Sequence, residues 1–480
     1  MYSADVRTKQ YRDFLSLSAT QFGLVGLQLI FAIFTTRLFA PEAFTSYAVS
    51  LALLGIVGIV SQFGLGNAAA RIDPMRENDA AGLFWFSIKI GLTGTLLTLL
   101  LAAPWALLWS NDDARNLILF LAPTIFFSTP TSVLIGVSLK RESFQLISKT
   151  RVLGGVTALI VSLIVINFWK SILAIAIFPL LLSFLTFFLM CTANFKLIHK
   201  IPKRYALRHN LTFALFSLRT SIFRYSVGII PTFLMAKYFS DSLLGNWNRG
   251  VTFIQVPVEQ VTNSIKNIIY SKYAELSDDS ESLHFNLTRL VGAFSIIIFP
   301  LTMSVIPFVP IVIETIFTNK WEYLILISQI LLASTAIGVI YNLTESCLES
   351  ANYQDICFRS ALVAGTTTIT LSFASFFSKN WLILALIPIV SPLIGHLCQL
   401  ILWRHRQNGD LKILIRIYLK GFIFGILFFG LVTIAVSSKQ ILSAKSILGL
   451  ISFCIVMILY LAQVKKISFT ELLTVRNIVS

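Results

Sequence analysis

Apolar runs close to the length of a membrane span recur from one end of this chain to the other. A helix needs about 20 predominantly apolar residues to cross a bilayer, and inside the bilayer it must satisfy its own backbone polar groups. Only 12% of the 480 residues are charged, which is roughly half of the share that is usual in soluble proteins. The chain is therefore predicted to be an all-α, polytopic membrane protein.

About fourteen transmembrane helices can be counted from the apolar runs, with boundaries good to a few residues. They are predicted at 14–36, 43–66, 82–103, 115–137, 150–168, 171–191, 212–239, 243–271, 284–309, 322–345, 356–377, 381–402, 412–436 and 441–463. Residues 203–218 fit either an interfacial helix before the seventh span or the first part of that span. The N-terminal apolar run is too long for a signal peptide and is assigned to the first span.

The distribution of Lys and Arg predicts how the chain is oriented. With fourteen spans, both termini lie on the same side of the membrane. The loops and ends on that side carry 24 Lys and Arg residues, and those on the opposite side carry 8. Under the positive-inside rule both termini are predicted to be cytoplasmic. The same rule explains the formal net charge of +16 without a nucleic-acid partner.

Two short segments related by 200 residues resemble each other. Residues 37–47 follow the first span and residues 237–247 follow the seventh, and each has a base first, Phe third, an acid near its middle and an aromatic residue last. Six spans separate them, so both copies point the same way, which predicts parallel halves with the substrate site between them. The expected domains are an N-terminal six-helix lobe at 1–200, a C-terminal six-helix lobe at 201–403, and two additional helices with a cytoplasmic tail at 404–480.

The eighth predicted span carries a polar face. At about 100° per residue its polar side chains fall on one side: these are Arg249, Thr252, Glu259, Gln260, Asn263, Lys266, Asn267 and Tyr270. An ionisable group at the centre of a span costs about 2.5–3.5 kcal/mol if it faces lipid, so this face is expected to line a water-filled cavity. A charged cavity of this kind indicates a transporter. Pro257, in the middle of the helix, is the expected bending point.

Basic residues dominate the ionisable groups within the predicted spans. Lys89, Arg219 and Arg224 join Arg249 and Lys266. Arg binds phosphate oxygens through paired hydrogen bonds and Lys acts as a point charge, so such a cavity favours an anionic substrate. Lys89 and Arg219 lie near the cytoplasmic ends of their spans, so snorkelling to the interface is the alternative for these two.

No catalytic motif is present. The sequence contains no GxGxxG, P-loop, HExxH or GxSxG pattern, and its five cysteines have no metal-binding spacing. No cofactor, metal site or catalytic residue is predicted, and the protein is not expected to be an enzyme.

Three stretches of the chain carry a resemblance to a known family. Residues 37–44 (RLFAPEAF), 63–71 (FGLGNAAAR) and 244–250 (LGNWNRG), the last followed by Pro257 and Tyr270, resemble sequences of the bacterial polysaccharide flippases. The first two resemble the start of that family, and the third resembles its LGxYNRA…P…FP stretch. Trp247 and Gly250 replace the family's Tyr and Ala, and Tyr270-Ser271 replaces its final Phe-Pro. By position, Arg71 and Arg249 match arginines of the family motifs. The family shares a superfamily with multidrug extrusion proteins and lipid II flippases.

The resemblance implies two six-helix lobes in a V shape around a cationic cavity, in the bacterial cytoplasmic (inner) membrane. The substrate would be an undecaprenyl-diphosphate-linked oligosaccharide, an O-antigen or exopolysaccharide repeat unit. Alternating access would move it from the cytoplasmic to the periplasmic leaflet. A polysaccharide polymerase and a chain-length regulator would be the partner proteins.

On this hypothesis the diphosphate would bind Arg224, Arg249 and Lys266. The sugar hydroxyls would meet Gln260, Asn263, Asn267 and Tyr270, and Lys89, Arg71 and Arg219 complete the expected substrate-binding set. Glu259 is the candidate for coupling transport to an H⁺ or Na⁺ gradient.

Two alternatives belong to other functional classes. A multidrug cation antiporter of the same fold is disfavoured because basic rather than acidic groups dominate the interior. A polysaccharide polymerase or ligase is disfavoured because no loop between the predicted spans exceeds about twenty residues.

Overall fold

The computed structural model describes residues 2–62, 64–71, 77–141, 143–200, 208–273, 280–317, 320–407 and 412–436. Within these ranges every regular element is a helix, and eleven segments are long and apolar enough to cross a membrane. Each of the eleven overlaps one predicted span: they are Thr20–Leu38, Pro41–Gln62, Glu77–Trp109, Asp112–Lys140, Phe144–Phe168, Ile172–Ala193, Asn286–Ile316, Leu324–Ser350, Gln354–Ser378, Trp381–Arg406 and Leu414–Ile434. The chain is an all-helical, polytopic membrane protein.

Three of the fourteen predicted spans are not among these eleven segments. Residues 212–239 and 243–271 are helical in the structure, but their many polar residues lower the mean hydropathy. The predicted span at 441–463 lies outside the described residues. Residues 208–238 form one continuous helix, so the described part of segment 203–218 is joined to the seventh span.

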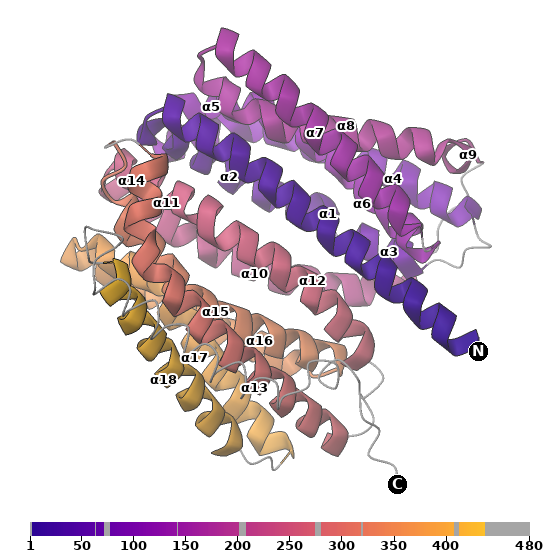
Figure 1. Ribbon diagram of the computed structural model, residues 1–480. Coiled ribbons are helices and arrows are strands. Elements are labelled where there is room, and N and C mark those ends of the chain that lie inside the picture. Colours follow the sequence, from indigo (N-terminus) through magenta and orange to yellow (C-terminus); the bar gives the residue numbers. More distant parts are fainter. Residues whose placement is uncertain are drawn as a thin grey trace. The chain divides into compact units, whose positions relative to one another are not determined.

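Packing divides the chain into two compact units, residues 1–249 and 250–480. The first unit contains α1 (Tyr2–Leu38), α2 (Pro41–Gln62), α3 (Leu65–Arg71), α4 (Glu77–Trp109), α5 (Asp112–Leu121), α6 (Pro123–Lys140), α7 (Phe144–Phe168), η1 (Ile172–Ala176), α8 (Ile177–Ala193), α9 (Phe195–Ile198), α10 (Arg208–Tyr238) and all but the last residue of α11 (Asp241–Gly250). Figure 1 shows α1, α7 and α8 side by side, and these helices pack on one another. α10 packs on α2, which explains why it belongs to this unit.

The second unit contains η2 (Val251–Gln255), α12 (Val256–Tyr273), α13 (Ser280–Val305), η4 (Ile306–Phe308), α14 (Val309–Ile316), α15 (Leu324–Ser350), α16 (Gln354–Ser378), α17 (Trp381–Gln407) and α18 (Lys412–Val436). α13 lies beside α18, and α17 packs on both α15 and α16 (Figure 1). The core joins Leu287 of α13, Leu343 of α15, Trp403 of α17 and Leu414 of α18, all nearly inaccessible. α18 is therefore an integral part of this unit.

Local sequence sets several of the helix boundaries. Asn111 caps α5 by accepting a hydrogen bond from the backbone N–H of Ala114, as N-cap residues do. Pro123 begins α6, a position that suits proline because an N–H there would have no partner within the helix. This proline breaks the predicted span at 115–137 into α5 and α6. Lys379 adopts the left-handed conformation, with φ of 52°, and ends α16.

The outer face of α4 shows how the helices meet lipid. Leu92, Leu96 and Leu100 are 49%, 50% and 76% exposed and recur at helical spacing. A contiguous row of exposed leucines is what a lipid-facing helix surface presents. Lys89 is also exposed and lies one turn before Leu92 and Thr93 along the same side of the helix. Its position fits the snorkelling alternative, although its role stays a prediction.

Candidate functional site

A buried arginine is the first feature of the candidate site. Arg249 occupies the last turn of α11 and is only 3% exposed. Its guanidinium carbon lies 4.0 Å from the centre of the Phe44 ring of α2. Its Nη2 donates a hydrogen bond of 2.9 Å to Oδ1 of the adjacent Asn248. Among the described residues no carboxylate pairs with it, and its Nε–H has no acceptor.

The surroundings of Arg249 hold a second unsatisfied group. Asn246, one turn earlier on α11, is completely buried. Its amide nitrogen donates to the backbone oxygen of Ser242 at 2.8 Å, but its Oδ1 has no partner in the described part of the chain. Burying a charge without a counter-ion is unfavourable, and Arg249 and Asn246 each keep a buried polar atom whose hydrogen-bonding capacity the described residues leave unused.

Close packing between α2 and α11 holds Arg249 in place. The side chain of Thr45 donates to the backbone oxygen of Asp241. A Cβ atom placed on Gly245 would lie 1.8 Å from the backbone oxygen of Pro41, so only glycine permits this approach. These contacts join the two segments that were expected to be repeats, 37–47 and 237–247, within the first unit. Burial and the neighbouring carboxylate of Glu42 raise the pKa of Asp241 above its ordinary value.

The helix changes its hydrogen-bonding pattern directly after Gly250. Residues Val251–Gln255 form a π-helical turn, in which the N–H of Val256 donates to the carbonyl of Val251. Pro257 follows immediately. Since Pro257 has no N–H, the carbonyl four residues before it has no regular α-helical partner. π turns are rare in proteins, and those that occur are often found at functional sites. This one lies where Pro257 was expected to bend the helix.

A polar cavity of about 220 Å³ lies in the second unit, after the π turn. The π turn η2 and helices α12, α15 and α17 line it with Gln255, Val258, Glu259, Thr262, Ser334, Thr335, Gly338, Val339, Asn342, Pro388 and Pro392. Glu259 is exposed to the cavity side of its helix, whereas Thr262, Ser334 and Thr335 are buried. Lys266, two turns after Glu259, donates from Nζ to Oδ1 of Asn342 at 3.4 Å. The cavity thus brings Glu259 close to a basic group.

The residues predicted from the sequence fall into four groups. Arg249 is buried and Arg224 half-buried, both in the first unit, while Lys89 lies on the exposed face of α4. Gln260 and Lys266 are half-buried on α12, and Asn263 is exposed there. Glu259 lines the cavity. The side chains of Arg71, Arg219, Asn267 and Tyr270 lie outside the described part of the structure.

The polar residues of α15 were not predicted from the sequence. Ser334, Gly338 and Asn342 recur every four residues, which places them on one face of α15. That spacing is a signal that the sequence carries. It is weaker than the polar face of residues 243–271, because none of the three residues is charged.

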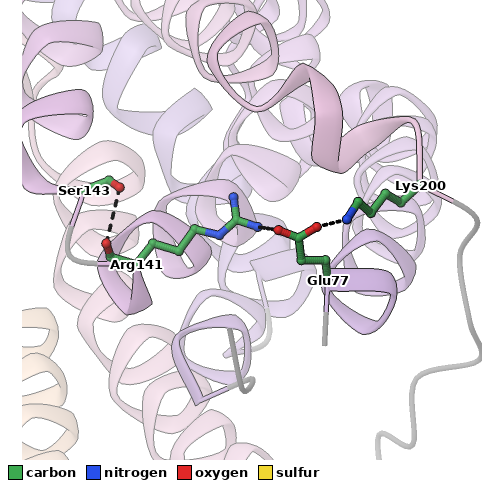
Figure 2. Close-up of polar contacts among 4 residues, drawn as sticks. All are labelled: Glu77, Arg141, Ser143 and Lys200. Carbon is green, nitrogen blue, oxygen red and sulfur yellow. Dashed lines mark hydrogen bonds and ion pairs between the residues drawn. The ribbon is translucent and has the colours of Figure 1, made fainter. Parts of the chain in front are cut away.

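Three charged side chains form an ion-pair network in the first unit. Glu77, at the start of α4, pairs through Oε1 with Nη2 of Arg141 at 2.9 Å and through Oε2 with Nζ of Lys200 (Figure 2). The partners follow α6 and α9, so the contact joins three neighbouring loops. All three side chains are partly exposed, and pairs of this kind contribute about 0–1 kcal/mol each.

Comparison with known proteins decides the family. A family described as "Polysaccharide biosynthesis protein" matches residues 17–326, well over half of the chain. The chain belongs to this family. The predicted family is thereby confirmed.

Relatives and solved structures agree with that assignment. The chain is 22% identical to the lipopolysaccharide biosynthesis protein WzxC of Escherichia coli over 351 residues, covering 70% of this chain and 69% of the relative. It is 20% identical to the teichuronic acid biosynthesis protein TuaB of Bacillus subtilis over 306 residues, covering 62% of each chain. The fold is similar to that of the lipid II flippase MurJ, with a TM-score of 0.71 at 15% identity, covering 93% of this chain and 99% of MurJ.

Multidrug transporters share the fold at a lower level of similarity. The eukaryotic MATE transporter AtDTX14 has a TM-score of 0.58 and 14% identity, over 86% of this chain and 98% of its own. At these identities the likeness establishes the fold alone. Because one fold serves several functions, the transported compound must be inferred from the site.

Proposed function

We propose that this protein is a flippase for an undecaprenyl-diphosphate-linked oligosaccharide, an O-antigen or exopolysaccharide repeat unit. It would carry the unit from the cytoplasmic to the periplasmic leaflet of the bacterial inner membrane. Membership of the polysaccharide biosynthesis family and the similarity to WzxC and TuaB support this class of substrate. The observation that carries the proposal is the buried Arg249, which lacks a carboxylate partner among the described residues.

The diphosphate fits Arg249 on both electrostatic and geometric grounds. A guanidinium presents a planar fork of donors that matches phosphate oxygens, and the Nε–H of Arg249 is one donor that is not yet used. Stacking on Phe44 fixes the plane of the guanidinium. In a low-dielectric site a paired anion offsets the cost of burying the cation. Arg224 would supplement this charge.

The polar residues of α12 would contact the glycan part of the substrate. Gln260, Asn263 and Lys266 lie on that helix, where they could contact the glycan and its charged groups. Glu259 would couple transport to an H⁺ or Na⁺ gradient, since an acidic group in a membrane cavity can change its protonation or ion occupancy. The polyprenyl tail would stay in lipid. A polysaccharide polymerase and a chain-length regulator would act as partners.

A drug-cation antiporter is disfavoured by the same arginine. A cationic drug would meet a buried, uncompensated positive charge, and like charges in a low-dielectric site repel strongly. The similarity to MATE transporters concerns the fold. The site therefore favours an anionic substrate.

Substitution of Arg249 tests the proposed function. In a strain lacking the gene, Arg249→Ala is expected to abolish surface glycan, and Arg249→Lys to restore it only in part because lysine lacks the paired donors. The readout is surface glycan together with the leaflet in which the lipid-linked oligosaccharide accumulates. Arg115→Ala, at an exposed position at the start of α5, is the matched control and should behave like wild type.

Arg249→Met separates substrate binding from a purely structural role. Replacing a buried, unpaired charge by an apolar side chain of similar length should leave the thermal stability unchanged or raise it. Surface glycan should nevertheless be lost. Normal glycan output from Arg249→Ala or Arg249→Met at wild-type protein levels would overturn the proposal.

A further inference from the structure

The cavity of the second unit contains polar groups that a phosphate-binding role leaves unused. Gln255 and Glu259 make no side-chain hydrogen bond to any described residue. Ser334 and Thr335 are buried in α15, which is long and apolar enough to span a membrane. Polar side chains are unfavourable within a membrane helix unless a partner or a ligand satisfies them, so Gln255 and Glu259, placed around one cavity with buried hydroxyl groups, point to a polar ligand.

Three hydroxyl groups of this cavity have already donated their protons to the backbone, so they can only accept hydrogen bonds from a ligand. Thr262 donates its proton to the backbone oxygen of Val258 at 2.7 Å, Ser334 to that of Leu331 at 2.7 Å, and Thr335 to that of Leu332 at 2.6 Å. Each hydroxyl oxygen keeps lone pairs for a ligand.

The remaining polar groups of the cavity supply both donors and acceptors. The carboxylate of Glu259 accepts only, and the amides of Gln255 and Asn342 supply donors. The wall therefore offers more acceptors than donors. A ligand that satisfies it must itself donate several hydrogen bonds and must also accept some.

The size and charge of the cavity narrow the choice of ligand. About 220 Å³ is many times the roughly 10–15 Å³ needed to hold one water, so the cavity has room for a ligand much larger than a coupling ion. Nζ of Lys266 donates a hydrogen bond to Asn342, one of the lining residues, and this positive charge disfavours a cationic ligand of that size. Pro388 and Pro392 give one side of the cavity an apolar surface without N–H donors.

We infer that this cavity binds one sugar ring of the transported glycan, and this inference rests on the flippase function proposed above. Each sugar hydroxyl both donates and accepts, which matches a wall of carboxylate, hydroxyl and amide groups. The C–H face of the ring packs on the two prolines of α17. The role proposed for this cavity, selection of the sugar, is separate from the diphosphate binding proposed for Arg249.

Gly338 makes the inference testable. It lines the cavity, and a Cβ atom placed on it has no neighbour within 4 Å. A leucine at this position occupies the cavity without displacing the backbone, and leucine is a better helix former than glycine. Gly430 of α18 is also free of neighbours within 4 Å and does not line the cavity, so Gly430→Leu is the matched control.

Sugar binding can be measured directly by saturation-transfer NMR on the purified full-length protein in detergent. The probes are glucose, galactose, N-acetylglucosamine and glucuronate. At least one of them is expected to give saturation transfer with wild type and Gly430→Leu, reduced at least fivefold in Gly338→Leu. Thr335→Val, which removes one acceptor at nearly constant shape, should also reduce it and guards against misfolding of Gly338→Leu.

Two results of this measurement would overturn the inference. The first is the absence of transfer from all four sugars to wild type. The second is equal transfer in Gly338→Leu and wild type. If no sugar binds but sodium ions bind to wild type and not to Glu259→Gln, the cavity is a cation site instead.

Transport in proteoliposomes separates this inference from the proposed function. Wild type and Gly430→Leu should flip an undecaprenyl-diphosphate-linked oligosaccharide, and Gly338→Leu should flip it at least tenfold more slowly. Flipping by Gly338→Leu at the wild-type rate would reject the sugar site and leave the flippase function intact. Failure of wild type to flip the lipid would reject both.

Discussion

Gly245 is a residue at which α11 approaches the backbone of α2 closely, and its substitution tests that contact. An alanine Cβ would lie 1.8 Å from the carbonyl oxygen of Pro41, a backbone atom that cannot rotate away. Overpacking of this kind typically costs about 1–3 kcal/mol. Gly245→Ala is therefore expected to lower the thermal unfolding temperature of the purified protein and to reduce transport, because Arg249 lies one turn further along α11.

The control for Gly245→Ala is a glycine in the same unit with free space around it. A Cβ atom placed on Gly228 of α10 has no neighbour within 4 Å. Gly228→Ala should be neutral or stabilising by up to about 1 kcal/mol, since alanine favours helix more than glycine. Equal unfolding temperatures for the two variants would show that α2 can move away from α11 without cost.

Single residues also show what a sequence can reveal about a site. Arg249 could be identified because a charged side chain within a membrane span is energetically costly and is usually retained for a function. Its partner Phe44 could not, since a phenylalanine near a span is ordinary until folding places it 4.0 Å from the guanidinium. Lys89 illustrates the opposite difficulty: whether a lone lysine faces a cavity or lipid depends on how its helix packs, and α4 exposes it beside leucines.

At the scale of helices, Pro257 and the π turn before it are structurally linked. The missing N–H of Pro257 leaves the carbonyl of Phe253 without an α-helical donor, and residues 251–255 widen into π geometry. Pro257→Ala restores that donor. We expect the turn to become regular α-helix, with slower amide hydrogen exchange over residues 251–257 and slower transport, because a continuous helix bends less readily.

Pro300→Ala provides the comparison for Pro257→Ala. Pro300 also lies inside a helix of the second unit, α13, and its replacement should leave exchange over residues 251–257 unchanged. Unaltered exchange in Pro257→Ala would mean that packing around the turn, rather than the proline, maintains the π geometry.

Helices were easier to predict than their interruptions. Apolar runs of spanning length have few alternatives in a bilayer, so each of the eleven apolar spans in the described residues could be located, although some boundaries differ from the prediction by up to seven residues. Short elements such as α3 and α9, and the break at Pro123, depend on local turns that hydropathy averages over a window. The sequence predicted a bend at Pro257 but not that residues 251–255 would form a π turn there.

At the scale of the whole molecule, the internal sequence repeat and the packing of the helices place the boundary between the two halves of the chain at different residues. The repeat predicts lobes that meet near residue 200, which stays a prediction. Packing assigns α10 to the first unit because it lies against α2, and the division falls at 249/250. A sequence shows which segments are related but not which surfaces bury one another, so the second boundary required the structure.

The same distinction applies to fold and function. A TM-score of 0.71 with MurJ at 15% identity shows that helix packing tolerates nearly complete replacement of side chains, provided that apolar faces are retained. The groups that would contact substrate are few and specific. Function therefore has to be argued from Arg249 and the cavity rather than from the fold.

The orientation of the chain in the membrane is the remaining prediction at this scale. The excess of Lys and Arg, 24 against 8, predicts cytoplasmic termini under the positive-inside rule. Lys140 and Lys170 are exposed at opposite ends of α7, one before it and one after it. After replacement of the five native cysteines, Lys170→Cys should react with a membrane-impermeant maleimide in intact cells, and Lys140→Cys only after the membrane is permeabilised.

Reversed labelling would contradict more than the topology. The loops joined by Glu77, Arg141 and Lys200 (Figure 2) would then face the periplasm. The ends of α2 and α11 that contact each other near Gly245 would face the cytoplasm. Labelling of these two positions therefore determines on which side of the membrane the α2–α11 contact and the ion-pair network of Glu77 lie, and with them the end of the first unit at which Arg249 is nearer to the surface.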